Sequence, residues 1–449
     1  MEYLRFIKFN KIIWDIMYDK LLNRKENIAV VGLGYVGLPL AILFSKKFNV
    51  IGFDVDSEKI SLYKKGIDIT GDLPENSLVD SNIHFTSNSE DIKKASFIVI
   101  AVPTPINDED NPDFKYIISA SELVGSNLTE GSIVVYESTV YPGVTEDICI
   151  PILEKFSKLT CGEGFNVGYS PERISPGDKN NRIENITKIV SGYNEESKKI
   201  ISKVYESVLN NGVYETESIK VAEAAKIVEN VTRDVNIALV NEFAMIFNKM
   251  GINTIDVIEA AGTKWNFQKY YPGLVGGHCI SVDPYYLLYK SKKLNFNPKL
   301  MQISRDINEN IPEFIVKNII YLMINDNVPI KESNALVLGV TFKENCNDIR
   351  NSKIVNVIKE LEELGINVSV YDYYADKKNV KSSYGIDLID NYDDKKYDVI
   401  IFGVAHDDFK DISLEDIIKL SKNKPIVIDL KSILSSNIKS YNNLTYWSL

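Results

Sequence analysis

The feature that most constrains the fold is a run of glycines between two apolar segments near the start of the sequence. Residues 27–31 (Asn-Ile-Ala-Val-Val) form a β-like run, and Gly-Leu-Gly-Tyr-Val-Gly follows at 32–37. A helical pattern comes next, and then a second apolar run at 50–53 that ends in Asp54. In a dinucleotide-binding βαβ unit the three glycines make the turn, admit a pyrophosphate and allow close helix–strand packing. The stretch therefore predicts a Rossmann-like domain whose pyrophosphate site comprises Gly32, Gly34, Tyr35, Val36 and Gly37.

The acid at the end of the second run indicates which dinucleotide is bound. Asp54 lies about where a carboxylate binds the ribose 2′-hydroxyl, which favours NAD over NADP. The alternative is a glycine-rich turn in an unrelated α/β protein. Taken together, the strand, glycines, helix, second strand and acid favour an NAD site.

Further strand-like runs alternate with helical patterns along the chain, which is typical of an α/β fold. They lie at 97–102, 132–136 and 166–169 in the first half, and at 334–340, 368–371, 398–402 and 426–429 in the second. A long helical pattern runs from about 217 to 250 between the two halves. The predicted class is α/β, with two Rossmann-like doubly wound domains joined by a long central helix. The predicted boundaries are an N-terminal helical extension at 1–26, an NAD-binding domain at 27–215, a central helical and dimerisation domain at 216–320, and a C-terminal Rossmann-like domain at 321–449.

Polar residues follow three of the expected strands, where ligands bind in open α/β sheets. Thr104, Ser138 and Thr139 are candidates to line the cofactor cleft, although Ser and Thr also bond to local backbone in turns. Glu172 and Arg173 follow the run at 166–169. They form either a surface salt bridge or part of the site, where Glu172 would act as a base or hold a water.

Two polar residues lie one turn apart on the long helix. Lys226 and Asn230 share one face because they are four residues apart. An ammonium group and an amide placed side by side can stabilise a developing oxyanion. The alternative is a solvated polar stripe.

A glycine-rich stretch from Pro272 to Pro284 carries a single cysteine, Cys279, with His278 before it and Asp283 four residues on. A thiolate presented on such a loop is suited to covalent catalysis. The alternative is a small buried residue in a turn. His278 is either a ligand contact or a loop-packing residue.

Composition excludes several classes of protein. The 449 residues carry a net charge of −11, which disfavours nucleic-acid binding. The four cysteines show no CxxC pairing, so we expect no metal site, no disulfide framework and a cytoplasmic location. No apolar run reaches the length of a membrane span. The first 26 residues favour an amphipathic helix that packs on the protein or a partner, with a membrane-surface helix as the alternative.

Together these motifs resemble the nucleotide-sugar 6-dehydrogenases, the family of UDP-glucose dehydrogenase, over nearly all of residues 27–435. The resemblance rests on motifs in order: Gly32–Gly37, Val102–Pro105, Ser138–Val140 with Pro142-Gly143, Glu223–Lys226 with Asn230, Gly276–Cys279 with Asp283, and Phe342-Lys343. It implies two successive hydride transfers to NAD that convert the C6 alcohol of a UDP-sugar to a carboxylate. Independently of the resemblance, the long helix predicts a homodimer or higher homo-oligomer, because a helix of this length usually bridges domains or lies in a subunit interface.

The resemblance assigns roles to individual residues. Cys279 resembles the nucleophile that captures the C6 aldehyde as a thiohemiacetal, which is then oxidised to a thioester. Lys226 and Asn230 match the groups that stabilise the oxyanion, Asp283 matches a general base, and Thr139 and Glu172 match positions that hold the water. Arg350 is implied to reach the cofactor or the substrate. The implied substrate contacts are Glu172, Arg173, Lys226, Asn230, Tyr270, Gly273, Gly276, Phe342 and Lys343.

The departures from the UDP-glucose enzymes indicate the sugar. This chain has His278 where those enzymes usually have Tyr, Arg173 after Ser-Pro-Glu, and 262–267 in place of an Arg-Ile-Gly segment. These forms resemble the branch that acts on UDP-N-acetylhexosamines, and UDP-N-acetylglucosamine is the expected substrate in surface polysaccharide or glycan precursor synthesis. UDP-N-acetylgalactosamine, UDP-N-acetylmannosamine and UDP-glucose are the alternatives. A one-step dehydrogenase of the 6-phosphogluconate type would not need Cys279, and a non-catalytic nucleotide-binding protein would not need Lys226, Asn230 or Asp283.

Overall fold

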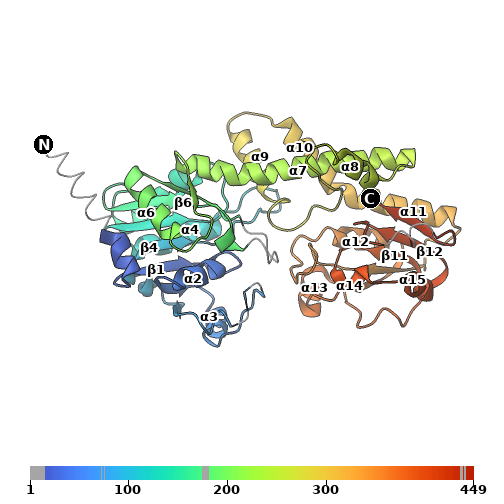
Figure 1. The fold of residues 1–449 in the computed structure, drawn as a ribbon, viewed down its shortest axis with the longest axis horizontal. Helices are drawn as coiled ribbons and strands as arrows, with labels where there is room; N and C mark the ends of the chain where they lie inside the picture. Colours follow the sequence, from blue (N-terminus) through green and yellow to red (C-terminus); the bar gives the residue numbers. More distant parts are fainter. Residues whose placement is uncertain (1–15, 72, 75, 174–181, 435–437, 439–440) are drawn as a thin grey trace. The chain divides into compact units, whose positions relative to one another are not determined.

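The chain folds into two compact units. The structure, a computed structural model, describes residues 16–71, 73–74, 76–173, 182–434, 438 and 441–449. One unit comprises the residues up to 229 together with 285–290, and the other comprises 230–284 and 291–449. The chain passes from the first to the second within the long helix α7 (Ile219–Met250). The predicted α/β architecture of two Rossmann-like domains joined by a long helix is confirmed (Figure 1).

The first unit is built on an eight-stranded sheet in the order β3-β2-β1-β4-β5-β6-β7-β8. Its strands are β1 (Asn27–Val31), β2 (Asn49–Phe53), β3 (Ile83–Thr86), β4 (Ala95–Ile100), β5 (Ser132–Tyr136), β6 (Phe165–Tyr169), β7 (Lys188–Gly192) and β8 (Val213–Glu215). Its helices are α2 (Gly37–Ser45), α3 (Ser57–Lys64), η1 (Ser89–Lys94), α4 (Lys115–Asn127), η2 (Thr145–Cys149), α5 (Ile150–Ser157), η3 (Ile183–Asn185) and α6 (Glu195–Glu206). Neighbouring strands are parallel except β6 and β7, which pair antiparallel.

The register of this sheet brings the polar loops to one edge. Val31 pairs with Ile100, Ile100 with Tyr136, and Tyr136 with Tyr169, so β1, β4, β5 and β6 end at the same level. These strands are apolar and almost fully buried, as expected for a parallel sheet covered on both faces. The loops that follow the four strands therefore share the carboxyl edge of the sheet.

The N-terminal extension is described only in part. Residues 16–22 are helical, and Met17 and Leu21 are buried in the core of the first unit. Residues 1–15 of the predicted extension lie outside the described residues.

The second unit contains a five-stranded parallel sheet in the order β10-β9-β11-β12-β13. Its strands are β9 (Asn334–Leu338), β10 (Asn367–Tyr371), β11 (Tyr397–Phe402), β12 (Ser421–Asp429) and β13 (Thr445–Ser448). Beside part of α7, its helices include α8 (Thr254–Ala261), α10 (Lys299–Glu309), α11 (Ile311–Asn325), α12 (Ile354–Glu363), α13 (Lys377–Tyr384), α14 (Asp407–Lys410) and α15 (Leu414–Leu420). Helix α9 (Asp283–Lys293) has residues in both units.

Alternate residues of β9 show that this sheet is covered on both faces. Ala335 and Val337 belong to a core cluster that includes residues of α11 and α12, whereas Leu336 and Leu338 belong to a second cluster that includes residues of α14 and α15. Because successive side chains of a strand point to opposite faces, the two clusters lie on opposite sides of the sheet. Among the described helices, none has the combination of length and apolar character that a membrane span requires.

Candidate active site

The glycine loop after β1 has the geometry of a dinucleotide cradle. Gly32 has a φ of 93°, which only glycine adopts readily. A Cβ on Gly37 would lie 1.8 Å from the carbonyl oxygen of Gly32, so no larger residue fits there. A Cβ on Gly34 would meet nothing within 4 Å, so a ligand can approach the backbone at that point. Tyr35 and Val36 are half-buried beside this opening, before the N-terminus of α2.

Asp54 follows the last residue of β2 and is hydrogen-bonded to the glycine loop. Its Oδ2 accepts hydrogen bonds from the backbone N–H of Leu33 and from Lys59 Nζ, both at 2.9 Å, and its Oδ1 accepts one from the N–H of Asp56 at 3.0 Å. A carboxylate has about four acceptor positions, so this pattern leaves one on Oδ1 for a ribose hydroxyl. The residues of this edge therefore fit NAD, and a pyrophosphate at Gly34 and a ribose at Asp54 remain predictions.

The loops after β4 and β5 are joined through their hydroxyl groups. Thr104 Oγ1 donates to the carbonyl oxygen of Thr139 at 2.7 Å, and Ser138 Oγ donates to that of Val102 at 2.7 Å. The structure thus brings Thr104, Ser138 and Thr139 together, and these two hydroxyls bond to backbone in the way that turn chemistry predicts. A role beside the cofactor remains a prediction for all three.

A buried ion pair that sequence reasoning missed lies behind these loops. Lys188 Nζ on β7 is 2.7 Å from Glu137 Oε2, and the two side chains are 1% and 0% exposed. Lys188 also donates to the carbonyl oxygen of Pro171 at 3.1 Å, and the hydroxyl of Tyr205 donates to Glu137. Because Glu137 precedes Ser138 and Pro171 precedes Glu172, one ammonium group connects the two loops that carry Thr139 and Glu172.

Glu172 and Arg173 have different surroundings. Glu172 is 8% exposed, so its carboxyl is buried among the strand ends. Arg173 forms an ion pair with Glu229 of α7 at 2.7 Å and donates to the carbonyl oxygen of Thr187 at 2.8 Å. Arg173 thus forms a salt bridge of the kind that its sequence position suggested, with Glu229 as its partner.

Helix α7 contributes two buried charged residues to the first unit. Glu223 accepts hydrogen bonds from the N–H groups of Gly143 and Thr145 at 2.6 and 2.9 Å, and so holds the loop after β5. Burial raises the pKa of Glu223 to about 7, although these two hydrogen bonds oppose the shift. Lys226, one turn on, is 6% exposed, which argues against the alternative of a solvated stripe.

In the second unit the cysteine loop meets two of the predicted catalytic residues. Asn230 Nδ2 donates to Asp283 Oδ2, and the N–H of Asp283 donates to the carbonyl oxygen of Cys279 at 2.8 Å. Asp283 is 2% exposed at the start of α9, whereas Cys279 and Asn230 are half-buried. The structure therefore brings Cys279, Asn230 and Asp283 into one cluster within this unit.

The backbone of this loop is fixed by hydrogen bonds to Asn241 and by close packing on the segment that follows β9. Asn241 of α7 accepts from the N–H of Gly273 at 2.8 Å and donates to its carbonyl oxygen at 3.1 Å. Gly277 has a φ of 80°, and a Cβ there would lie 2.9 Å from the ring of Phe342. A Cβ on Gly276 would lie 2.6 Å from the carbonyl oxygen of Asn351. The cysteine loop therefore packs directly on the loop that carries Phe342 and Lys343, while Tyr270 is half-buried before it.

His278 and Arg350 lie together at this junction. Arg350 Nη2 is 3.1 Å from His278 Nε2, and its guanidinium also pairs with Asp348 at 2.7 Å. The ring of His278 packs edge-on against Phe342. Arg350 thus lies beside the cysteine loop in the second unit, and a contact with cofactor or substrate remains a prediction.

The other three cysteines are poorly suited to be nucleophiles. Burial raises the pKa of Cys149 and of Cys161 to about 12, and it also raises the pKa of Cys346. A thiol with a raised pKa has little thiolate at neutral pH. Cys279 is the cysteine that lies next to a carboxylate and an amide on a glycine-rich loop.

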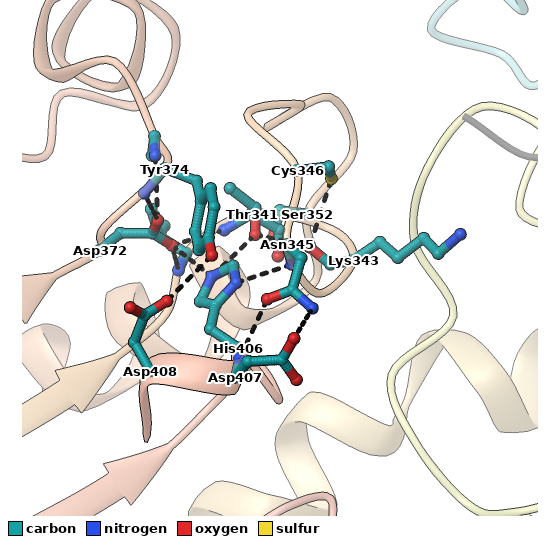
Figure 2. A network of polar contacts seen from close by, with 12 residues as sticks. Thr341, Lys343, Asn345, Cys346, Ser352, Asp372, Tyr374, His406, Asp407 and Asp408 are labelled. Atoms are coloured by element: carbon teal, nitrogen blue, oxygen red, sulfur yellow. Dashed lines mark hydrogen bonds and ion pairs between the residues drawn. The ribbon is translucent and has the colours of Figure 1, made fainter. Parts of the chain in front are cut away.

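Lys343 lies on a loop after β9 that is held by a polar cluster (Figure 2). Thr341 Oγ1 donates to the carbonyl oxygen of Lys343 at 2.8 Å, and the thiol of Cys346 donates to the same oxygen at 3.3 Å. His406, which follows β11 and is fully buried, lies at the centre of this cluster. Sequence reasoning missed His406, although its position after a strand was a usable signal.

Comparisons with known proteins agree with this geometry. Models of the UDP-glucose/GDP-mannose dehydrogenase family match the chain with their NAD binding domain at 26–209, central domain at 220–310 and UDP binding domain at 336–436. Protein CapL of Staphylococcus aureus is 51% identical over 416 residues, which cover 93% of this chain and 97% of that protein. UDP-N-acetyl-D-glucosamine 6-dehydrogenase of Salmonella typhi is 48% identical over 408 residues, which cover 91% of this chain and 96% of that protein.

The fold also matches a solved structure. The UDP-D-ManNAc dehydrogenase of Pyrococcus horikoshii superposes with a TM-score of 0.85 and 31% identity, over 94% of this chain and 98% of that one. With the glycine cradle, the cysteine cluster and these relatives in agreement, the chain belongs to the UDP-glucose/GDP-mannose dehydrogenase family and is an NAD-dependent UDP-sugar dehydrogenase.

Proposed function

We propose that the protein oxidises the C6 alcohol of UDP-N-acetylglucosamine to the uronic acid, for the synthesis of a surface polysaccharide or glycan precursor. The choice of sugar is supported by the relatives. Two proteins named UDP-N-acetyl-D-glucosamine 6-dehydrogenase are 48% and 45% identical to this chain, whereas those named UDP-N-acetyl-D-mannosamine dehydrogenase are 34% identical or less. The single observation that carries the chemistry is the cluster of Cys279, Asn230 and Asp283.

Covalent catalysis by Cys279 accounts for two oxidations at one carbon. The first oxidation of the C6 alcohol gives an aldehyde, and the Cys279 thiolate adds to its carbonyl carbon to form a thiohemiacetal. Loss of the C6 hydride then gives a thioester. Water attacks the thioester carbonyl, the C–S bond breaks, and the carboxylic acid leaves as the thiolate is regenerated. The covalent bond retains the aldehyde between the two oxidations.

Asn230 and Lys226 are proposed to stabilise negative charge on the C6 oxygen. An amide nitrogen has two hydrogens, so Asn230 can donate one to Asp283 and point the other at the developing oxyanion. Lys226 lies on the same face of α7, one turn before Asn230. Its ammonium stabilises both the oxyanion and the thiolate form of Cys279. The removal of a single oxyanion donor typically lowers kcat by about 10²–10³-fold.

Three residues are proposed to hold or activate the hydrolytic water. Asp283 is buried, and its Oδ2 accepts a hydrogen bond from Asn230 Nδ2, which fixes the carboxylate beside α7. Glu172 is buried after β6, and Thr139 is held in the neighbouring loop through Thr104. A carboxylate that is fixed in this way can accept the proton of the attacking water.

NAD, when bound, accepts the hydride in each oxidation. The chain's residues are proposed to hold it at Gly34 and Asp54, with Thr104 and Ser138 along the adjacent loops. The substrate nucleotide is proposed to contact Lys343 and Phe342, and Gly273 and Gly276 of the cysteine loop are also proposed as substrate contacts.

A homodimer is also proposed, with α7 at its interface. Leu239, Phe243, Ile246 and Met250 are between 38% and 62% exposed, and their spacing places them on one side of the helix. An exposed apolar stripe of this kind favours association. A cytoplasmic location is proposed because the covalent mechanism needs Cys279 reduced.

The test of the sugar assignment is a panel of four substrates. The values of kcat/KM are measured with UDP-N-acetylglucosamine, UDP-N-acetylgalactosamine, UDP-N-acetylmannosamine and UDP-glucose. The proposal expects UDP-N-acetylglucosamine to have the highest value. A higher value for another of the four sugars would reassign the substrate, and turnover of none of them would refute the proposed activity.

A further inference from the structure

His406 lies at the centre of a polar cluster that joins three strand ends of the second unit (Figure 2). It follows β11, and its side chain is fully buried. Around it lie the segment after β9, which carries Thr341 and Asn345, and Asp372, which follows β10. Because the sheet order is β10-β9-β11, these three segments meet at the carboxyl edge of the sheet.

The hydrogen bonds of His406 fix its tautomer. The N–H of Asn345 donates to Nδ1 at 2.9 Å, so that nitrogen is an acceptor and carries no proton. The hydrogen of the neutral ring is therefore on Nε2, which lies 3.2 Å from Asp372 Oδ2 and 3.3 Å from Thr341 Oγ1. One imidazole thus holds both ends of the segment 341–345.

The carboxylate of Asp372 also hydrogen-bonds to the start of the loop after β9. Its Oδ2 accepts the N–H groups of Val340 and Thr341 at 2.6 and 3.2 Å, and its Oδ1 accepts those of Tyr374 and Ala375 at 2.8 and 2.9 Å. These four bonds, together with the contact of His406 Nε2 with Oδ2 at 3.2 Å, occupy all of the acceptor positions of the carboxylate. Asp372 follows the strand next to β9 as Asp54 follows the strand next to β1, yet it has no position left for a ribose hydroxyl.

The loop that is held in this way presents Lys343. Thr341 Oγ1, which lies 3.3 Å from His406 Nε2, donates a hydrogen bond to the carbonyl oxygen of Lys343. In Figure 2 the side chain of Lys343 extends away from the cluster, while its backbone stays bound to it. A long, flexible ammonium side chain loses less freedom on binding when its backbone is already fixed.

We propose that His406 is a positioning residue for the nucleoside diphosphate, because it orders the segment 341–345 so that the ammonium of Lys343 faces the diphosphate. This inference rests on the proposed function, in which Lys343 contacts the nucleotide. The ring itself touches no substrate, since it is fully buried. Its effect on binding therefore passes through Lys343.

The test is a double-mutant cycle on the affinity for UDP, measured by isothermal titration calorimetry on the full chain. Loss of the Lys343 ammonium in Lys343→Met should weaken UDP binding about tenfold or more, the usual loss for a hydrogen bond to a charged group. His406→Phe, which keeps a ring against Tyr374 and Phe409, should weaken it to a similar extent. The double variant should bind UDP about as weakly as either single variant, since coupled residues are not additive.

Two further variants provide a conservative replacement of His406 and a matched control. His406→Asn, which keeps an acceptor near the N–H of Asn345, should lie between wild type and His406→Phe, and it replaces His406→Phe if that variant does not fold. Tyr374→Phe removes a hydrogen bond to Asp408 at the outer side of the same cluster and should leave UDP binding within about twofold of wild type. The affinity for NAD, which binds the first unit, should be unchanged in all of them.

Three kinds of result would contradict the proposed role of His406. Losses that multiply to about a hundredfold in the double variant would show that His406 acts independently of Lys343, and would overturn the inference. An unchanged UDP affinity in His406→Phe, or a loss in Tyr374→Phe as large as that in His406→Phe, would also overturn it. Wild-type protein that binds NAD and not UDP would refute the proposed function, and the inference with it.

Discussion

Replacement of Lys188 by methionine should destabilise the first unit in a pH-dependent way. Lys188 and Glu137 are almost completely buried, and their charged atoms are 2.7 Å apart. Methionine has a similar length and no charge, so Lys188→Met leaves the Glu137 carboxyl in the same buried place without its cation. Breaking a buried pair from one side typically costs about 3–5 kcal/mol in the free energy of unfolding.

The pH dependence follows from the pKa of Glu137. Burial raises this pKa above its ordinary value of 4.5, and the Lys188 ammonium is the main influence that lowers it. Without the ammonium the pKa in the folded state rises further. A raised carboxyl pKa contributes stability that is present below the unfolded-state value and is lost as pH rises through the folded-state value. Relative to wild type, the penalty of Lys188→Met should therefore grow as pH rises above the folded-state pKa of wild-type Glu137, by up to about 1.4 kcal/mol per pH unit.

The assay is urea unfolding followed by circular dichroism between pH 5 and pH 8. The transition of the first unit is the one that added NAD moves to higher urea, because a ligand stabilises the unit that binds it. The control is Glu137→Gln/Lys188→Met, in which neither side chain titrates. It should unfold within about 2 kcal/mol of wild type, with no added pH dependence. If Lys188→Met lost the same free energy of unfolding at pH 5 and pH 8, the unpaired Glu137 carboxylate would not be the cause. A double variant as unstable as Lys188→Met would lead to the same conclusion.

Three other predictions follow from the site and from α7. Cys279→Ser should slow or stop the second oxidation and leave NAD affinity unchanged; an unaltered rate of acid production would exclude the covalent role. Burial raises the pKa of Glu223 to about 7, so it should contribute stability below about pH 4.5 that is lost as pH rises through about 7. Glu223→Gln should flatten this part of the curve of melting temperature against pH, and an unchanged curve would contradict the assignment. Light scattering should give the mass of a dimer that Phe243→Glu weakens, and an active wild-type monomer would argue against the α7 interface.

Local patterns were the most predictable part of the molecule. The strand–glycine–helix–strand pattern at 27–54 predicts a fold within a short span, because Gly32 adopts a positive φ and Gly37 leaves no room for a Cβ. The long helix was predicted at about 217–250 and found at Ile219–Met250, since its apolar spacing persists over many turns. The cysteine loop was recognisable from residue type, and the contact of Asn230 with Asp283 joins two residues that the resemblance had already selected.

Contacts between distant strands were not predictable in this way. Glu137 and Lys188 are 51 positions apart, and nothing in the local sequence of either indicates that one side chain faces the other. His406 and Asp372 meet because β9 lies between β10 and β11, and the sequence does not give that strand order. Arg350 was assigned by resemblance alone, and its neighbours, His278 and Asp348, were visible only in the folded second unit.

The measurement that tests the central claim most directly is the number of NADH molecules formed for each UDP-N-acetylglucosamine consumed, with the reaction run to completion. We expect about two, because each of the two oxidations of C6 releases one hydride. A value of one would contradict the four-electron mechanism and remove Cys279 from its centre, although the fold and the family assignment would stand.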